Sequence, residues 1–211
     1  MKVAVINGSP NTNGNTSIAL DEVCKVLGVS GIETFRVEIG RGALHGCVGC
    51  RLCVKRLNRR CAFEDDGVSD HMGRIFEADG LLIGSPVYYA GINGSLKCML
   101  DRLFTVASNN GSLFRHKVGA CVVAVRRGGE ISAWEQLNKY LMLSEMFVPS
   151  GDYWNMVFGT TPGEAVQDLE GMHVMRTLGS NMAWLLKGMA LAKSSQPLPE
   201  KKDKPRMNFI R

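Results

Sequence analysis

Five short apolar segments alternate along the chain with five segments of helical periodicity. The apolar segments are rich in Val, Ile and Leu, as parallel strands buried on both faces are. The segments between them carry apolar residues every three or four positions, which is typical of helices packed on a sheet. This alternation predicts an α/β fold with an open, doubly wound parallel sheet of five strands. The predicted strands are 2–6, 33–39, 80–84, 118–125 and 146–149, and the predicted helices are 15–27, 66–78, 94–107, 131–143 and 167–191.

Length and composition fit a single domain. The 211 residues, 45% of them hydrophobic, suffice for one sizeable core. We expect this domain to span residues 1–192, because residues 193–211 contain three prolines and no helical period, which predicts an extended, basic C-terminal arm. We find no apolar run long enough for a membrane helix and no signal peptide. Seven cysteines without an export signal favour a reducing compartment. We therefore expect a cytoplasmic protein that does not contact a membrane.

The net charge of +5 is unevenly distributed. The excess of basic residues lies in segment 51–60, which has five cations and no acid, and in the C-terminal arm. The rest of the chain is net acidic, so a broad basic groove for nucleic acid is not expected.

Four cysteines are concentrated between the second predicted strand and the second predicted helix, in a loop spanning residues 45–66. They are Cys47, Cys50, Cys53 and Cys61, and the first three recur at every third position. Four cysteines with such a run are the usual ligands of a [4Fe–4S] cluster. Two alternatives use the same residues: a zinc site, although two separated C-x2-C pairs are more usual there, and a redox disulfide within one C-x2-C pair. The other three cysteines are expected to be small buried hydrophobic residues.

The loop after the first predicted strand is rich in small polar residues. Residues 7–17 read NGSPNTNGNTS, with glycines that let the backbone approach a ligand and hydroxyl and amide groups that can bind it. A helix begins within this loop, where Asn15 or Thr16 can cap it, and a helix N-terminus attracts phosphate. The triphosphate-binding and dinucleotide-binding glycine motifs are both missing. The loop predicts an anion cradle, and the alternative is a polar turn with a good cap.

The loop after the third predicted strand places aromatic surface at the same edge of the sheet, because parallel strands end together. Pro86 fixes the exit from the strand, and Val87, Tyr88 and Tyr89 follow it. A flat aromatic ligand fits such a surface, whereas the alternative is that the tyrosines pack as ordinary core. On the next helix, we attribute Lys97, Asp101 and Arg102 to an ordinary i, i+4 ion pair on the helix surface.

Three segments together resemble the NADPH-dependent FMN reductase family of flavodoxin-like proteins: GSPNTNGNT, SPVYYAGINGSLKCMLDRL and PGEAVQDLEG. With the cysteine run, the chain resembles the iron–sulfur flavoprotein branch of that family over residues 2–190. The resemblance implies a flavodoxin-like fold, bound FMN and a [4Fe–4S] cluster held by the four cysteines. It implies that the FMN phosphate is held by Ser9, Asn11, Asn13, Gly14, Asn15 and Thr16. The isoalloxazine is expected beside Pro86, Val87, Tyr88 and Tyr89, with Asn93 nearby and the pocket completed by Arg126, Arg127, Gly128 and Gly129.

The function that this resemblance implies is electron transfer. We predict an FMN-dependent oxidoreductase that passes electrons between a one-electron carrier or NAD(P)H and an acceptor, through FMN and the cluster. The alternatives are a cluster-free NAD(P)H-dependent FMN or quinone reductase and a non-enzymatic flavodoxin-like carrier. The four histidines are scattered, and we predict no catalytic acid, base or nucleophile.

Two interactions are also expected. The basic segment 51–60 would receive an acidic electron carrier such as a ferredoxin or a rubredoxin, unless it is simply a solvated loop. The resemblance further implies a homodimer or homotetramer.

Overall fold

A six-stranded sheet forms the centre of the computed structural model, which describes residues 1–203, 205 and 207. Five strands lie in the order β2-β1-β3-β5-β6, and every pair along this path is parallel. They are β1 (Lys2–Asn7), β2 (Glu33–Glu38), β3 (Gly80–Tyr88), β5 (Val118–Val125) and β6 (Met156–Phe158). The predicted doubly wound, flavodoxin-like order is therefore confirmed. The sixth strand, β4 (Gly91–Ile92), was not predicted and pairs antiparallel with the end of β3.

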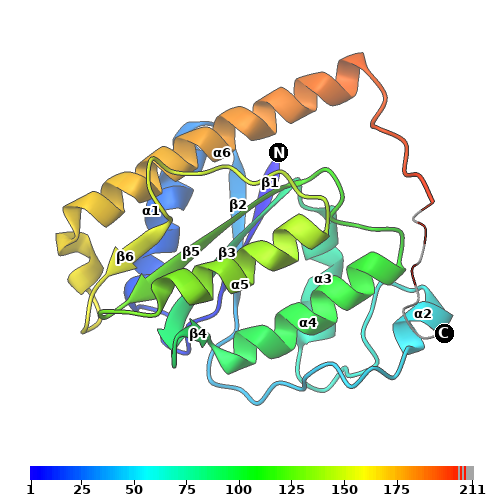
Figure 1. Cartoon of the computed structure of the whole chain (residues 1–211), viewed down its shortest axis with the longest axis horizontal. Helices are drawn as coiled ribbons and strands as arrows, with labels where there is room; N and C mark the ends of the chain where they lie inside the picture. Colours follow the sequence, from blue (N-terminus) through cyan, green and yellow to red (C-terminus); the bar gives the residue numbers. More distant parts are fainter. Residues whose placement is uncertain (204, 206, 208–211) are drawn as a thin grey trace.

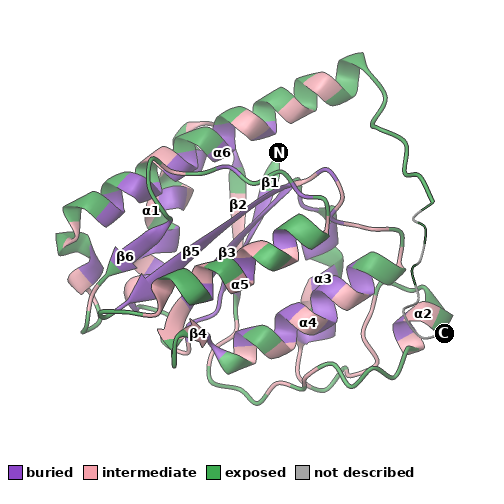
Figure 2. Cartoon of the chain, in the orientation of Figure 1, coloured by how far each residue is buried: buried purple, intermediate pink, exposed green. Residues whose placement is uncertain are grey.

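Helices cover both faces of the sheet (Figure 1). On one face lie α1 (Asn15–Val29) and α6 (Leu169–Ser195), and on the other lie α3 (Val68–Glu77), α4 (Gly94–Asn109) and α5 (Glu130–Leu143). Successive strand residues point to opposite faces, so Val5 and Leu82 pack with α1 and α6, whereas Ile6 and Ile83 pack with α3 and α4. β1, β3 and β5 are consequently buried between the helix layers (Figure 2).

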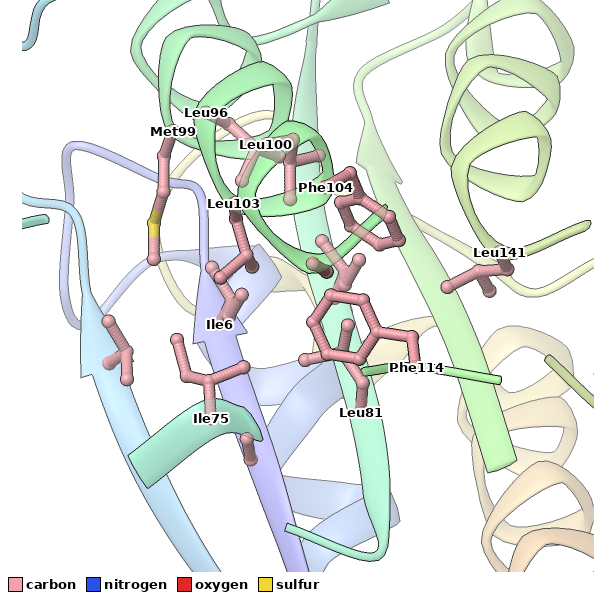
Figure 3. Close-up of a cluster of buried hydrophobic side chains, with 14 of the residues drawn as sticks. Ile6, Ile75, Leu81, Leu96, Met99, Leu100, Leu103, Phe104, Phe114 and Leu141 are labelled. Atoms are coloured by element: carbon pink, nitrogen blue, oxygen red, sulfur yellow. The ribbon is translucent and has the colours of Figure 1, made fainter. Parts of the chain in front are cut away.

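The core beneath α4 is built largely from long apolar side chains (Figure 3). Leu96, Leu100 and Leu103 recur on the buried face of α4, at the three- and four-residue spacing seen in the sequence. Phe104 and Phe114 contact each other with ring centroids 4.8 Å apart. This packing fixes α4 against the sheet, and α4 in turn supports the cysteine loop.

The predicted strand at 146–149 is wrong. Only Phe147 pairs there, in an isolated parallel bridge with Val118. Pro149 has no N–H with which to continue the ladder, and the chain leaves the sheet after it. The chain rejoins the sheet at Asn155, whose backbone O accepts the N–H of Val123 in β5 at 3.0 Å. β6 then pairs with the last residues of β5. The edge strand is thus split in two by residues 148–155.

Further boundaries differ from the prediction. β3 continues beyond the predicted limit at residue 84 to Tyr88, so Pro86, Val87 and Tyr88 belong to the strand and not to a loop after it. A short helix, α2 (Leu52–Arg56), lies inside the cysteine loop. The predicted helix 167–191 is two elements, the 3-10 helix η1 (Glu164–Gln167) and α6, because Asp168 caps α6 by accepting the Gly171 N–H at 2.9 Å. The predicted helix 66–78 begins only at Val68, after Gly67 at φ +74°.

The C-terminal segment leaves α6 at Ser195, so the helix extends beyond the predicted domain limit at residue 192. Residues 196–203 form no helix or strand, and Glu200 O accepts from Arg115 Nη2 at 3.4 Å. The rest of the predicted arm, residues 204, 206 and 208–211, lies outside the described residues. Within the described part of the chain, no helix has the length and apolar character needed to cross a membrane.

Candidate functional site

A cavity of about 210 Å³ lies at the carboxyl ends of β1, β3 and β5. Because these strands are neighbours in the sheet, the loops that follow them meet at one edge. Nine of the residues predicted from the sequence line this cavity: Ser9, Asn11, Gly14, Asn15, Thr16, Pro86, Val87, Tyr88 and Arg126. The lining does not include six others: Asn13, Tyr89, Asn93, Arg127, Gly128 and Gly129.

The loop after β1 is closely tied to the sheet and turns back on itself. The Gly8 N–H donates to Gly84 O at 2.8 Å, and a Cβ at Gly8 would lie 2.7 Å from the same oxygen. The Asn11 N–H donates to Ser9 Oγ at 3.1 Å. α1 begins at Asn15, and its N-cap, Gly14, offers no side-chain acceptor. Neither Asn15 nor Thr16 caps the helix, so the N–H groups of its first turn have no side-chain cap and are suited to an anion.

Asn15 lines the cavity, and its side-chain amide also forms hydrogen bonds with the backbone of a segment far away in the sequence. Its Oδ1 accepts the N–H groups of Gly163 and Ala165, each at 3.1 Å, and its Nδ2 donates to Thr161 O at 2.9 Å. Asn15 therefore positions segment 159–165, from which Gly159, Thr160 and Pro162 line the cavity. We did not predict from the sequence that this segment lines the cavity, although PGEAVQDLEG, residues 162–171, is one of the segments that carry the family resemblance.

Glu164 stabilises the same segment. Its carboxylate accepts the N–H groups of Thr160 and Thr161, at 2.6 and 2.9 Å, and the Thr161 hydroxyl at 2.7 Å. These hydrogen bonds favour the charged carboxylate and lower the pKa of Glu164.

Arg41 was also missed. It follows β2, whose end lies beside the end of β1, and its Nη2 donates to Asn11 Oδ1 at 2.8 Å. The sequence could have indicated Arg41, because it is a basic residue shortly after the predicted strand 33–39, and the carboxyl ends of parallel strands meet at the edge of the sheet where a ligand is expected.

The aromatic wall comes from the end of β3. Tyr88 is half-exposed and lines the cavity, and Tyr89 is fully exposed at φ +49°. Neither tyrosine is core, so the alternative interpretation of these residues is wrong. Gly129, at φ +91°, packs against this turn, since a Cβ there would lie 2.7 Å from Ala90 Cα. Asn93 is buried and caps α4, with Oδ1 accepting the Ser95 N–H at 2.8 Å.

The four clustered cysteines line a second cavity, of about 230 Å³, beside the second half of α4. Cys47 and Cys50 are exposed, Cys61 is half-buried and Cys53 is buried. Burial raises the pKa of the Cys53 thiol. No three His, Cys, Asp or Glu side chains in the described part of the chain come close enough together to hold a single metal ion. All four cysteines nevertheless line the same cavity.

Other side chains complete this second cavity. Phe63, Thr105, Val106 and Asn109 line it together with Arg102.

The surface ion pair predicted for α4 is present, with Lys97 Nζ 2.7 Å from the Asp101 carboxylate. The same assignment is wrong for Arg102, which is buried and donates to Cys61 Sγ in the cysteine loop. Among the other cysteines, Cys121 is buried as expected, whereas Cys24 and Cys98 are half-buried.

A parallel sheet in this order, with a ligand cavity where β1, β3 and β5 end, defines a flavodoxin-like α/β protein. A sequence profile described as NADPH-dependent FMN reductase matches residues 1–161. An iron–sulfur flavoprotein from Methanocaldococcus jannaschii is 32% identical to this chain, covering 89% of it and 98% of the relative.

Solved structures agree in fold. RosB, crystallised with 8-demethyl-8-formylriboflavin-5'-phosphate, superposes with a TM-score of 0.68 at 16% identity and covers 100% of this chain and 92% of its own. A flavodoxin described as WrbA-like, from Agrobacterium tumefaciens, gives a TM-score of 0.58 at 12% identity over 89% of this chain and 98% of its own.

The chain belongs to the NADPH-dependent FMN reductase family, in its iron–sulfur flavoprotein branch. It is thus an FMN-binding, flavin-dependent oxidoreductase.

Proposed function

We propose that this oxidoreductase transfers electrons through FMN and a [4Fe–4S] cluster, between a one-electron carrier or NAD(P)H and an acceptor. The observation that carries the proposal is that Cys47, Cys50, Cys53 and Cys61 all line one cavity on an FMN-binding fold. A flavin exchanges electrons singly or in pairs and an iron–sulfur cluster exchanges them singly, so the two groups together connect the two kinds of partner.

The cavity at the sheet edge fits FMN. The N-terminus of α1, which has no side-chain cap, and the hydroxyls of Ser9 and Thr16 would hold the phosphate, with Asn11 and Arg41 beside it. The side chains of Pro86, Val87 and Tyr88 would lie along the isoalloxazine, and Arg126 would close the pocket from β5. The protein's contribution is to bind and orient the flavin, since no acid, base or nucleophile is required of it.

The second cavity fits a multi-iron cluster better than a single ion. A structural zinc site usually takes its cysteines from two separated C-x2-C pairs, whereas three of these four cysteines recur at every third position and all four line one cavity of about 230 Å³. Four cysteine thiolates are the usual complement of a [4Fe–4S] cluster. Nearby cations favour thiolate over thiol, and the basic segment 51–60 supplies them. We place the protein in a reducing, cytoplasmic setting, where such thiols persist.

The exposed basic side chains around this cavity are the proposed docking surface for an acidic carrier such as a ferredoxin or rubredoxin. Arg51, Lys55, Arg56 and Arg59 are exposed, with the apolar side chains of Val48 and Leu57 among them. Arg60 is different, because its guanidinium pairs with Asp70 at 2.8 Å and Glu64 at 3.6 Å. The surface combines a positive rim with exposed cysteines, as an electron port for an anionic partner requires.

We further propose that the protein is a homodimer or homotetramer. At 1.5 Å per residue, Thr105, which lines the cysteine cavity, lies about 18 Å along α4 from its N-cap at Asn93, whose N–H donates to Ser85 Oγ of β3. A second copy of the chain could shorten the path between a cluster and a flavin, and light scattering of the purified protein measures the assembly directly.

Anaerobic purification followed by iron, sulfide and flavin analysis tests the proposed function. We expect one FMN and about four iron and four sulfide per chain. Replacing Cys50 and Cys53 by serine should abolish iron binding and leave FMN bound, because these residues do not line the flavin cavity. Flavin without iron, together with NADPH oxidation, would instead support the cluster-free reductase. A protein that binds flavin, contains no iron and does not oxidise NADPH would support a non-enzymatic electron carrier.

A further inference from the structure

Arg102 is buried beneath the cysteine loop. It stands on α4, and its side chain has 0% of its surface exposed. A guanidinium in such a place must have each charge and N–H group balanced by a partner, since an unpaired buried charge is costly. The identity of these partners shows what Arg102 does.

The guanidinium binds both ends of the cysteine loop. Its Nη1 donates to His45 O at 3.3 Å, at the start of the loop, and its Nη2 donates to Phe63 O at 2.8 Å, near the end. Nη1 also forms an ion pair with the Asp66 carboxylate. Asp66 in turn accepts the His45 N–H at 3.0 Å. One arginine on α4 therefore closes the loop that carries all four cysteines.

The remaining contact reaches one of the proposed cluster ligands directly. Arg102 Nε donates to Cys61 Sγ at 3.2 Å. A planar guanidinium supplies this bond and the carbonyl and carboxylate bonds at once, which the ammonium of a lysine cannot do in the same geometry.

We propose that Arg102 is a positioning residue that holds the cysteine loop in its cluster-binding conformation and sets the reduction potential through its Nε–H bond to Cys61. This inference rests on the proposed cluster. A hydrogen bond to a ligand sulfur stabilises the extra negative charge of the reduced state and so raises the potential. Asp66 acts in the opposite direction, because its negative charge offsets that of Arg102.

The test uses the anaerobically purified protein and three variants, Arg102→Lys, Arg102→Gln and Asp66→Asn. Arg56→Gln is the matched control, since it removes an exposed cation from the same loop, and in the described part of the chain the bond to Cys61 comes from Arg102. Iron, sulfide and FMN per chain are measured first, and the cluster potential is then measured by redox titration followed by electron paramagnetic resonance.

The two Arg102 variants are expected to lower the ratio of reduced to oxidised cluster about tenfold at fixed ambient potential, a downward shift of about 59 mV for a one-electron couple. Asp66→Asn is expected to shift the potential upward, because it leaves the positive charge of Arg102 without its counterion. A merely structural role would move all three variants in the same direction. If Arg102→Gln retains no cluster at all while FMN stays bound, the positioning role is supported, and Arg102→Lys and Asp66→Asn carry the test of the potential.

Two outcomes overturn the inference in distinguishable ways. A wild-type protein that binds FMN but no iron overturns the proposed cluster and this inference with it. A wild-type protein with a full cluster, and Arg102 variants that match Arg56→Gln in iron content and potential, overturns the role of Arg102 alone.

Discussion

The loop after β1, residues 7–17, contains no lysine or arginine, and Arg41 supplies a cation to it from the segment after β2. Its bond to Asn11, which lines the cavity, places the guanidinium beside the loop that we propose to hold the FMN phosphate. We expect Arg41→Gln to weaken FMN binding to the apoprotein about tenfold, since a charge-assisted contact to phosphate is lost. Riboflavin, which has no phosphate, should bind the variant and the wild type equally. Fluorescence titration with each flavin measures both affinities.

Arg127→Gln is the control for this substitution. Arg127 is exposed on the loop after β5 and does not line the cavity. Its loss should leave both flavins bound as in the wild type. An Arg41 variant that lost affinity for FMN and riboflavin in equal measure would speak against a phosphate contact and for a disturbed loop.

Some residues predicted from their place near strand ends come together in the structure. Ser9 lies just after β1, Pro86 and Tyr88 lie in the last part of β3, and all three line one cavity. Asn15 and Asn93 have the same polar chemistry, but Asn15 bonds segment 159–165 and Asn93 bonds the first turn of α4. The sequence does not show whether an amide will bind its own backbone, because that depends on which segments meet in the fold.

At the level of elements, periodicity located the helices and four of the strands. It failed at residues 146–149, where an apolar run and a real bridge at Phe147 were followed by Pro149. It also gave no sign of α2, whose five residues are too few for a helical period. Contacts distant in the sequence hold α2, among them Asn110 Nδ2 to Cys53 O at 3.2 Å. Tertiary contacts of this kind decide short elements and are absent from local patterns.

The closure of the cysteine loop should depend on acid pH. Bonds from Arg102 and from the His45 and Val68 N–H groups outweigh burial and lower the pKa of Asp66 below its usual 3.8. A carboxylate with a depressed folded pKa stabilises the fold above its unfolded pKa and loses that contribution as pH falls through the folded value. We therefore expect the loop to become more susceptible to proteases below about pH 4. Pulsed acid-active protease digestion, followed by mass spectrometry of residues 45–66, measures this directly.

Asp66→Asn is the comparison for the pH experiment. The side-chain amide of the variant does not titrate. At pH 5 the cysteine loop of the variant should therefore be cleaved faster than that of the wild type, and its cleavage rate should change less between pH 5 and pH 3. The neighbouring Asp65, whose carboxylate lies 3.4 Å from His45 Nε2, provides a second comparison through Asp65→Asn, and that variant should retain the wild-type pH dependence. Parallel pH profiles for the wild type and Asp66→Asn would contradict the assignment to Asp66.

In the whole molecule, the two cavities occupy different positions on one scaffold. The flavin cavity is at the carboxyl edge of the sheet, whereas the cysteine cavity lies beside α4 and opens among the basic side chains of segment 51–60. A carrier can therefore approach the cysteines without covering the flavin cavity. The basic excess lies in segment 51–60 and in the C-terminal arm, and segment 51–60 is the one that also carries cysteines of the cavity, so docking should depend mainly on this surface.

Reversing two exposed charges, Arg56→Glu together with Arg59→Glu, should slow reduction by an acidic ferredoxin or rubredoxin about tenfold or more at low ionic strength. The wild-type rate should fall as salt is added, whereas the rate of the variant should hardly change, since salt screens an attraction that the variant lacks. Stopped-flow measurement of reduction by the carrier, at several salt concentrations, gives both results. Arg60 is left intact because its charge is already paired with Asp70 and Glu64.

The matched control reverses two exposed lysines of α6, Lys187→Glu together with Lys193→Glu, which changes the net charge equally on a helix that packs on the other face of the sheet from α4. If docking is local, this control should keep nearly the wild-type rate and most of its salt dependence. Equal slowing in both double variants would show that the carrier responds to overall charge and has no defined site. An unchanged rate in Arg56→Glu/Arg59→Glu would instead mean that segment 51–60 is only a solvated loop, with its cations acting on the cysteines alone.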